Sequence, residues 1–127
     1  MTIISLSLNE AILHEIEKIQ KEQGYSSRSE VIRAGVRILS SENKEMDLLT
    51  GRINSILLLV HDHNVEIVVS NIKHNFEDIT TTQTHSHLKN NKCLEIFVLE
   101  GDTGRIKEMI RQFKTNKKMD LVKLIVA

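Results

Sequence analysis

The 127-residue chain has 17 Lys and Arg against 17 Asp and Glu, with 40% hydrophobic and 3% aromatic residues, which fits one ordinary domain or two small ones with a core of Ile, Leu and Val. A net charge of zero excludes a general attraction to nucleic acid or anionic lipid, so any DNA binding must be local. The single cysteine excludes an internal disulfide, and no signal peptide or membrane-length apolar run is seen, so we expect a cytoplasmic protein.

Residues 1 to 45 follow the pattern strand, helix, helix. Residues 3 to 8 alternate with a period of two, which is typical of a strand. The two faces of this strand carry Ile4, Leu6 and Leu8, and Ile3, Ser5 and Ser7. Asn9 is a suitable N-cap for a first helix, which should end at Gly24. The sequence SRSE at 27–30 has the spacing of a capping box, which predicts a second amphipathic helix from that point.

The strand at 3 to 8 has no partner within this segment, so its backbone groups need a second copy of the chain. Two such strands paired around a twofold axis make the segment resemble a ribbon-helix-helix (CopG-like) DNA-binding domain. The resemblance implies that the outward side chains of the ribbon meet base edges and that the start of the second helix meets phosphate. The residues in these positions are Ile3, Ser5, Ser7, Ser27, Arg28 and Ser29. The alternative is a plain dimerisation module with a solvated serine face.

In residues 52 to 127, segments whose apolar residues repeat with the strand period of two alternate with segments that have the helix period of 3.6. Strands are expected at 53–60, 79–88, 93–100 and 121–127, and helices at 64–78 and 103–118. The order strand, helix, strand, strand, helix, strand is that of a ferredoxin-like (ACT-like) sandwich. The whole chain is therefore predicted to be of the α+β class.

The strand at 93–100 is apolar on both faces, and a sheet of this kind has helices on one face only. We expect Leu94, Ile96 and Val98 to face the helices. The opposite face would then carry Cys93, Glu95, Phe97 and Leu99. Exposed Phe and Leu side chains imply that a second copy covers that face, with the candidate metal ligands on the same side.

Three candidate metal ligands gather at one hairpin. His85 and His87 are two apart on a strand, so both project from one face, and Cys93 lies on the next strand. An odd-length turn sets His87 opposite Cys93, whereas a two-residue turn would set Leu88 there. Metal binding therefore predicts an odd-length turn or a bulge. The remaining histidines of this unit, from which a fourth ligand could come, are His61, His63 and His74.

A ribbon-helix-helix unit over 1–45 followed by a ferredoxin-like unit over 52–127 resembles the nickel-responsive transcriptional regulators of prokaryotes (NikR type). The resemblance implies a square-planar site in which His85, His87 and Cys93 of one subunit meet His74 of another. It also implies a homodimer through the ribbon and a homotetramer through the C-terminal unit. Ni(II) would then enhance binding to an operator in double-stranded DNA and so repress metal uptake. Glu95 is expected to hydrogen-bond a ligand histidine.

Other interpretations of the same residues stay open. Cu(II) or Co(II) could replace Ni(II), or a small metabolite could occupy the sandwich interface and leave the histidines incidental. We expect no enzyme, because no oxyanion-type element accompanies Cys93 as a nucleophile. Members of the family often have an auxiliary cation site on acidic residues of the second helix, where this chain has Glu30 but Ala34 four positions later. His61 and His63 could hold a second, weaker metal.

Overall fold

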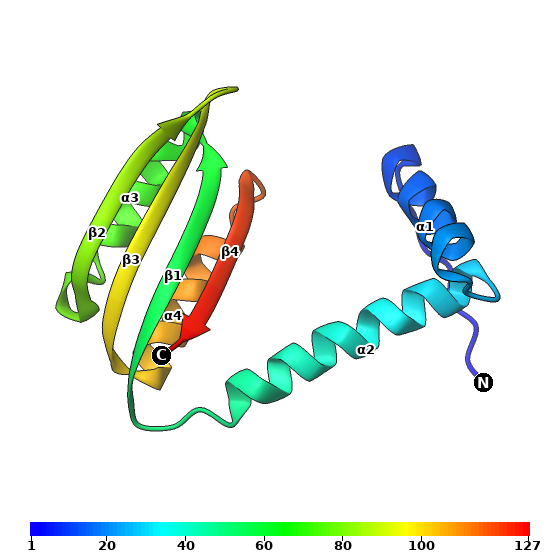
Figure 1. Ribbon diagram of the computed structural model, residues 1–127, viewed down its shortest axis with the longest axis horizontal. Coiled ribbons are helices and arrows are strands. Elements are labelled where there is room, and N and C mark those ends of the chain that lie inside the picture. Colours follow the sequence, from blue (N-terminus) through cyan, green and yellow to red (C-terminus); the bar gives the residue numbers. More distant parts are fainter. The chain divides into compact units, whose positions relative to one another are not determined.

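The computed structural model describes all 127 residues. The chain divides into an N-terminal unit, Met1–Leu48, and a C-terminal unit, Leu49–Ala127, which are described separately (Figure 1). None of the helices combines the length and the apolar character that a membrane span requires.

The N-terminal unit contains two helices, α1 (Glu10–Gln23) and α2 (Arg28–Asp47). Both begin at the predicted N-caps, because the side chains of Asn9 and Ser27 each accept a hydrogen bond from the backbone N–H three residues on, at 2.9 and 3.1 Å. Gly24 ends α1 with a left-handed φ of 77°, a conformation that glycine adopts without steric cost. These local signals alone account for the bounds of the first helix and the start of the second.

The N-terminal unit does not complete a hydrophobic core within one chain. Only Ile16 and Val31 are buried there. Residues 1 to 8 precede α1 without forming a strand ladder inside the chain. The large apolar side chains that stay exposed are Met1, Ile3, Ile4, Leu6, Leu8, Ile12, Ile19, Val36, Ile38, Leu39 and Leu48. So much exposed apolar surface beside an unpaired extended segment is what the predicted pairing with a second copy requires.

The C-terminal unit is a four-stranded antiparallel sheet with strand order β2-β3-β1-β4. Its elements are β1 (Arg52–Asp62), α3 (Glu66–His74), β2 (Thr80–Leu88), β3 (Lys92–Asp102), α4 (Thr103–Lys114) and β4 (Met119–Val126). Figure 1 shows α3 and α4 together on one face of this sheet. The predicted α+β class and the predicted order of elements are therefore confirmed.

The core of the C-terminal unit lies between the sheet and its two helices. Cys93, Glu95, Phe97 and Leu99 of β3 point into it, and none of them is more than 1% exposed. The prediction that these four residues face away from the helices is therefore wrong. Because β3 is apolar on both faces, its alternation cannot show which face the helices cover. β1 and β2 run parallel to each other, and α3 connects them. The right-handedness of such a crossover decides which face of the sheet the helices cover.

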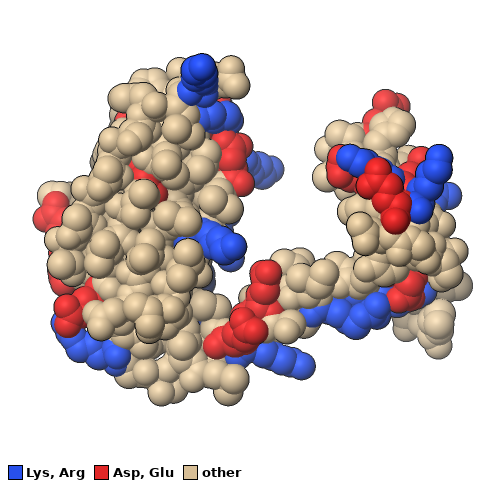
Figure 2. All heavy atoms as spheres, in the orientation of Figure 1, with Lys and Arg blue, Asp and Glu red and all other residues tan.

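The other face of the sheet is left without a cover inside the chain. Ile56 pairs with Val98 on one side and with Ile125 on the other, so the three side chains share this face, and all are exposed. Figure 2 shows few charged side chains on it. An apolar sheet face of this kind still predicts a covering partner. The residues to be covered are these three, with Leu121, rather than Phe97 and Leu99.

Candidate metal centre and nucleic-acid interface

The β2–β3 hairpin brings His87 and Cys93 face to face. Its turn consists of residues 89 to 91, and the last two, both Asn, have φ values of 64° and 60°. Asn enters this left-handed region more readily than most residues with a side chain. The register pairs His87 with Cys93 and His85 with Glu95, so all four side chains share the helix-covered face. The odd-length turn that metal binding predicts is therefore confirmed.

Cys93 also has a histidine on its other side. β1 pairs with β3 so that His61 lies opposite Cys93, which places the thiol between His61 of β1 and His87 of β2. β1 then ends at Asp62, and its carboxylate caps a single 3-10 turn over His63–Val65. This turn carries the next histidine back toward the sulfur.

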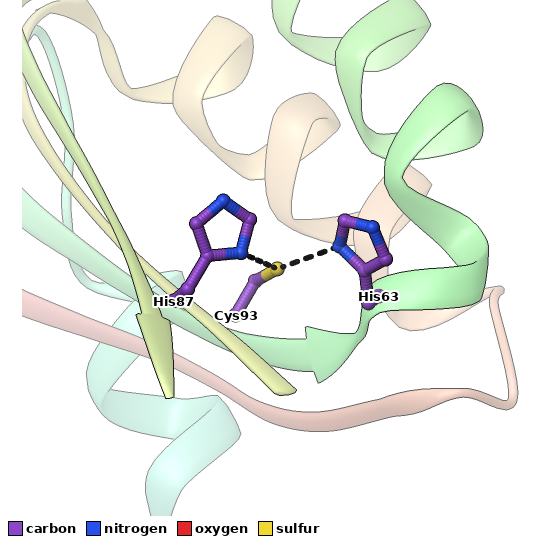
Figure 3. Close-up of side chains that lie close together, drawn as sticks. All are labelled: His63, His87 and Cys93. Atoms are coloured by element: carbon purple, nitrogen blue, oxygen red, sulfur yellow. Dashed lines mark hydrogen bonds between the residues drawn. The ribbon is translucent and has the colours of Figure 1, made fainter. Parts of the chain in front are cut away.

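His63 and His87 converge on the sulfur of Cys93 (Figure 3). The Nδ1 atoms of His63 and His87 lie 3.5 and 3.8 Å from the Cys93 Sγ. One donor atom from each residue lies within 4.8 Å of the other two. With metal–sulfur and metal–nitrogen bonds of about 2.3 and 2.0–2.1 Å, a tetrahedral ion separates sulfur from nitrogen by about 3.5 Å. These three residues therefore fit a metal ion without rearrangement of the backbone.

The Cys93 thiol is shielded from water at 0% exposure. Burial raises its pKa above the ordinary value, and the nearby Glu66 carboxylate raises it further. A free thiol in this place is protonated at neutral pH, so it is a poor nucleophile. A metal ion that binds the sulfur as thiolate must displace that proton.

A buried polar network surrounds Glu95, next to the cysteine cluster. The Glu95 carboxylate is 0% exposed, and it accepts hydrogen bonds from Lys73 Nζ at 2.8 Å and Gln83 Nε2 at 3.1 Å. His61 Nε2 lies 2.6 Å from its other oxygen. Burial by itself raises the pKa of Glu95, but the hydrogen bonds from Lys73 and His61 outweigh it and hold the pKa below the ordinary value. Within one chain Glu95 thus hydrogen-bonds His61, and a ring nitrogen of His85 lies within 4.8 Å of one of its carboxylate oxygens.

Glu66, at the start of α3, is a residue that sequence reasoning missed. Its Oε1 lies 3.5 Å from His85 Nδ1, and its Oε2 is buried without a hydrogen-bond partner. Glu66, Val69 and Lys73 follow one another at helical spacing, and Val69 is 1% exposed. A carboxylate and an amine on the apolar stripe of a helix were the signal that could have revealed this network.

His74 lies apart from the other predicted ligands in the single chain. It is the last residue of α3, its side chain is 78% exposed, and its Nδ1 lies 2.9 Å from the Glu77 carboxylate. None of the groups of metal-ligating side chains that lie close together within the chain includes it. Its imidazole is therefore accessible to another subunit.

The predicted DNA contacts occupy two places in the N-terminal unit. Ile3, Ser5 and Ser7 lie in the extended segment before α1 and are exposed, Ile3 to 93%. The Ser27 hydroxyl caps α2 by accepting a hydrogen bond from the Glu30 N–H. Arg28 and Ser29 are the first two residues of this helix. Both basic and acidic side chains lie on the face of this unit that Figure 2 shows. Glu30, the acidic residue of the possible auxiliary site, is paired with Arg33 and Arg37 at 3.0 and 2.8 Å.

Comparison with known proteins agrees with both units. Residues 55–127 match the family model described as the NikR C-terminal nickel-binding domain, and residues 2–37 match that of ribbon-helix-helix proteins of the copG family. A candidate nickel-responsive regulator of Methanocaldococcus jannaschii is 36% identical over 99% of this chain and 92% of its own length. A relative given the same name in Methanococcus maripaludis is 34% identical with the same coverage.

Two solved structures share the sheet architecture at low identity. The uncharacterised protein TM1266 of Thermotoga maritima has a TM-score of 0.57 at 18% identity, over 60% of this chain and 98% of its own. The C-terminal domain of the MgtC protein of Mycobacterium tuberculosis has a TM-score of 0.52 at 6% identity, over 61% of this chain and 89% of its own. These likenesses concern the fold alone.

The family established by the closer relatives is one of regulators and not of enzymes, as the absence of catalytic elements around Cys93 predicted. With one family model covering residues 55–127 and relatives more than 30% identical over 99% of its length, this chain belongs to the nickel-responsive regulators of the ribbon-helix-helix class.

Proposed function

We propose that this protein is a transcriptional regulator that binds operator DNA through its N-terminal unit when Ni(II) is bound in its C-terminal unit, and that it thereby represses metal uptake. The observation that carries the proposal is that the β2–β3 register places His85 and His87 on one face with the buried Cys93 thiol, whose Sγ lies 3.8 Å from His87 Nδ1, inside the unit that matches a nickel-binding family model. Nitrogen and thiolate donors on one rigid sheet are a suitable set for a late divalent transition metal.

The proposed nickel site is shared between subunits. His85, His87 and Cys93 lie on one face of the β2–β3 hairpin, and β2 is an edge strand, so a second subunit can approach these side chains. The exposed His74 imidazole of that second subunit supplies the fourth donor. Three imidazole nitrogens and one thiolate in a plane suit Ni(II), while the same set also accepts Cu(II). Glu66 positions the donor His85 from behind, because its Oε1 lies 3.5 Å from His85 Nδ1, while Glu95 holds His61, which lies opposite Cys93 on β1.

The proposed DNA site forms only in a dimer. Pairing of residues 3 to 8 from two chains satisfies their backbone groups and covers Ile4, Leu6 and Leu8, which a single chain leaves exposed. Ile3, Ser5 and Ser7 then point outward into the major groove, and the start of α2 meets a phosphate. Because residues 1 to 45 carry six basic and seven acidic side chains, general affinity for DNA should be low. A bound metal that fixes the arrangement of two such dimers is therefore needed for firm binding.

The two sites are coupled through the assembly. The apolar sheet face around Ile56 and the shared metal site both join C-terminal units of different subunits, which makes a homotetramer with two ribbons. A metal that ties subunits together favours one arrangement of the ribbons, and by linkage DNA that selects this arrangement favours metal binding. Regulation thus needs no contact between metal and DNA.

A selection on random duplex DNA tests this function without knowledge of the operator. The full-length protein is incubated with a library of short duplexes, with either Ni(II) or a chelator, and retained DNA is sequenced over several rounds. We expect a twofold-symmetric sequence to be enriched with Ni(II) and not with chelator. His87→Ala should abolish the enrichment, while His14→Ala, which changes an exposed histidine of α1, should not.

The same selection contains the outcomes that contradict the proposal. Equal enrichment with Ni(II) and with chelator would show a DNA-binding protein that does not respond to metal. Enrichment with Cu(II) or Co(II) but not with Ni(II) would show that the regulator responds to another metal. Unchanged enrichment in a Ser5→Ala, Ser7→Ala double variant would show that these two ribbon serines do not read the DNA sequence.

A further inference from the structure

We propose that His63 is a metal ligand, and that His63, His87 and Cys93 form a second metal site that is complete within one subunit. This inference rests on the proposed function, because it takes His87 and Cys93 to be metal ligands in the shared site. It adds His63, which the predicted nickel site does not include, and a site that requires no second subunit.

The first argument is the geometry of the three donors. The separations of 3.5 and 3.8 Å between the Cys93 Sγ and the two Nδ1 atoms are close to the value of about 3.5 Å for a tetrahedral ion. Cis donors in a square plane would need a separation of about 3.0 Å for bonds of the same length. The cluster within one chain therefore favours a tetrahedral ion over a planar one.

The second argument is that the backbone holds His63 in place. The N–H of His63 donates to the carbonyl oxygen of Asn91 at 2.9 Å, which ties the end of β1 to the β2–β3 turn. The Asp62 carboxylate accepts from the Asn64 N–H at 2.8 Å and fixes the 3-10 turn on which His63 lies. Because Cys93 belongs to the central strand between β1 and β2, all three donors are attached to one rigid framework.

The third argument concerns the fourth position. His63 and His87 are both exposed residues, whereas Cys93 is buried, so the cluster opens to solvent on the histidine side. Two imidazoles, one thiolate and a water molecule make a tetrahedral set that suits Zn(II) and Co(II). Ni(II) prefers four donors in a plane, so it binds in the shared site, where the exposed His74 of a second subunit is the fourth ligand.

The two sites exclude each other, because both use His87 and Cys93. An ion held by His63 occupies the thiolate without linking subunits, so it does not favour the DNA-binding arrangement. The cluster thus gives tetrahedral metals a place in which they bind without activating the regulator. His63 is in this sense a residue that determines metal specificity.

Co(II) alone is a suitable probe, since tetrahedral Co(II) has strong visible absorption and a thiolate adds a charge-transfer band. The experiment uses the full-length protein with His74→Ala, which removes the shared site and leaves the proposed one. We expect this variant to bind one Co(II) per chain with the tetrahedral, thiolate-containing spectrum and without a change of assembly size. Adding His63→Ala should weaken Co(II) binding by at least about tenfold and remove the tetrahedral bands.

Controls separate this inference from the proposed function. His14→Ala in the His74→Ala background should leave the Co(II) spectrum unchanged, and His63→Ala alone should leave the planar Ni(II) spectrum of the otherwise natural chain unchanged. An identical Co(II) spectrum and affinity with and without His63 would overturn the inference while leaving the nickel site intact. Unchanged binding of both metals in Cys93→Ser would reject the shared nickel site and the second site together.

Discussion

Glu95 is a buried carboxylate whose removal should destabilise the C-terminal unit measurably. Glu95→Gln keeps the shape of the side chain but removes the charge that pairs with Lys73 Nζ at 2.8 Å and lies 2.6 Å from His61 Nε2. Removing one partner of a fully buried pair costs about 3–5 kcal/mol. The Lys73 side chain is 17% exposed and can turn toward water, so we expect a loss of about 2–3 kcal/mol at neutral pH.

The assay is denaturant unfolding of the full-length protein, at one chain concentration because the assembly contributes to stability. Glu100→Gln is the matched control, since this carboxylate lies on the same strand, is 52% exposed and pairs with Arg52 at 3.5 Å. The control should change the free energy of unfolding by less than about 1 kcal/mol.

The sign of the pH dependence gives a second check on Glu95. Its pKa in the folded protein lies below the ordinary value, so its ionisation stabilises the fold above the ordinary carboxyl pKa, and this contribution is lost as pH falls toward the folded value. The difference between the natural chain and Glu95→Gln should therefore shrink on acidification. A loss no larger than that of Glu100→Gln, or a difference that grows at low pH, would refute the role assigned to the buried network.

Three further predictions concern other parts of the C-terminal unit. Gly101→Ala should lower the thermal midpoint by an amount equivalent to about 1–3 kcal/mol, because the added Cβ would lie 2.6 Å from Ile79 Cγ2; Ile79→Ala should relieve part of this loss. Ile56→Asp on the uncovered sheet face should reduce the mass of the assembly measured by light scattering, and an unchanged mass would show that this face is not an interface. Ni(II) affinity should fall as pH decreases, with proton release in calorimetry, because burial and Glu66 raise the Cys93 pKa.

Local signals predicted much of this structure. The caps at Asn9 and Ser27 depend only on neighbouring residues, and both form as expected. The turn at residues 89 to 91 has the odd length that places His87 opposite Cys93. The order of strands and helices in the C-terminal unit follows from the switch between periods of two and 3.6.

What the sequence did not show depends on contacts between distant segments. The covered face of β3 could not be chosen from its own residues, and this led to the wrong assignment of Cys93 and Phe97 to the uncovered face. The approach of His63 to Cys93 depends on the pairing of β1 with β3, which joins residues about thirty positions apart. From the sequence, His63 was grouped with His61 for a second, weaker metal, because the pairing of β1 with β3 that brings His63 to Cys93 was not known.

The sharing of one metal ion between subunits is the central claim, and subunit mixing tests it most directly. His74→Ala keeps the three donors of the hairpin, and Cys93→Ala keeps the exposed His74, so neither variant alone can build the planar site. The two variants are mixed, exchanged through denaturation and refolding, and titrated with Ni(II) while the planar thiolate absorption is followed. We expect each variant alone to lack this absorption and the mixed assembly to regain part of it. Absorption in the mixture no greater than the sum of the separate variants would contradict a site built from two subunits.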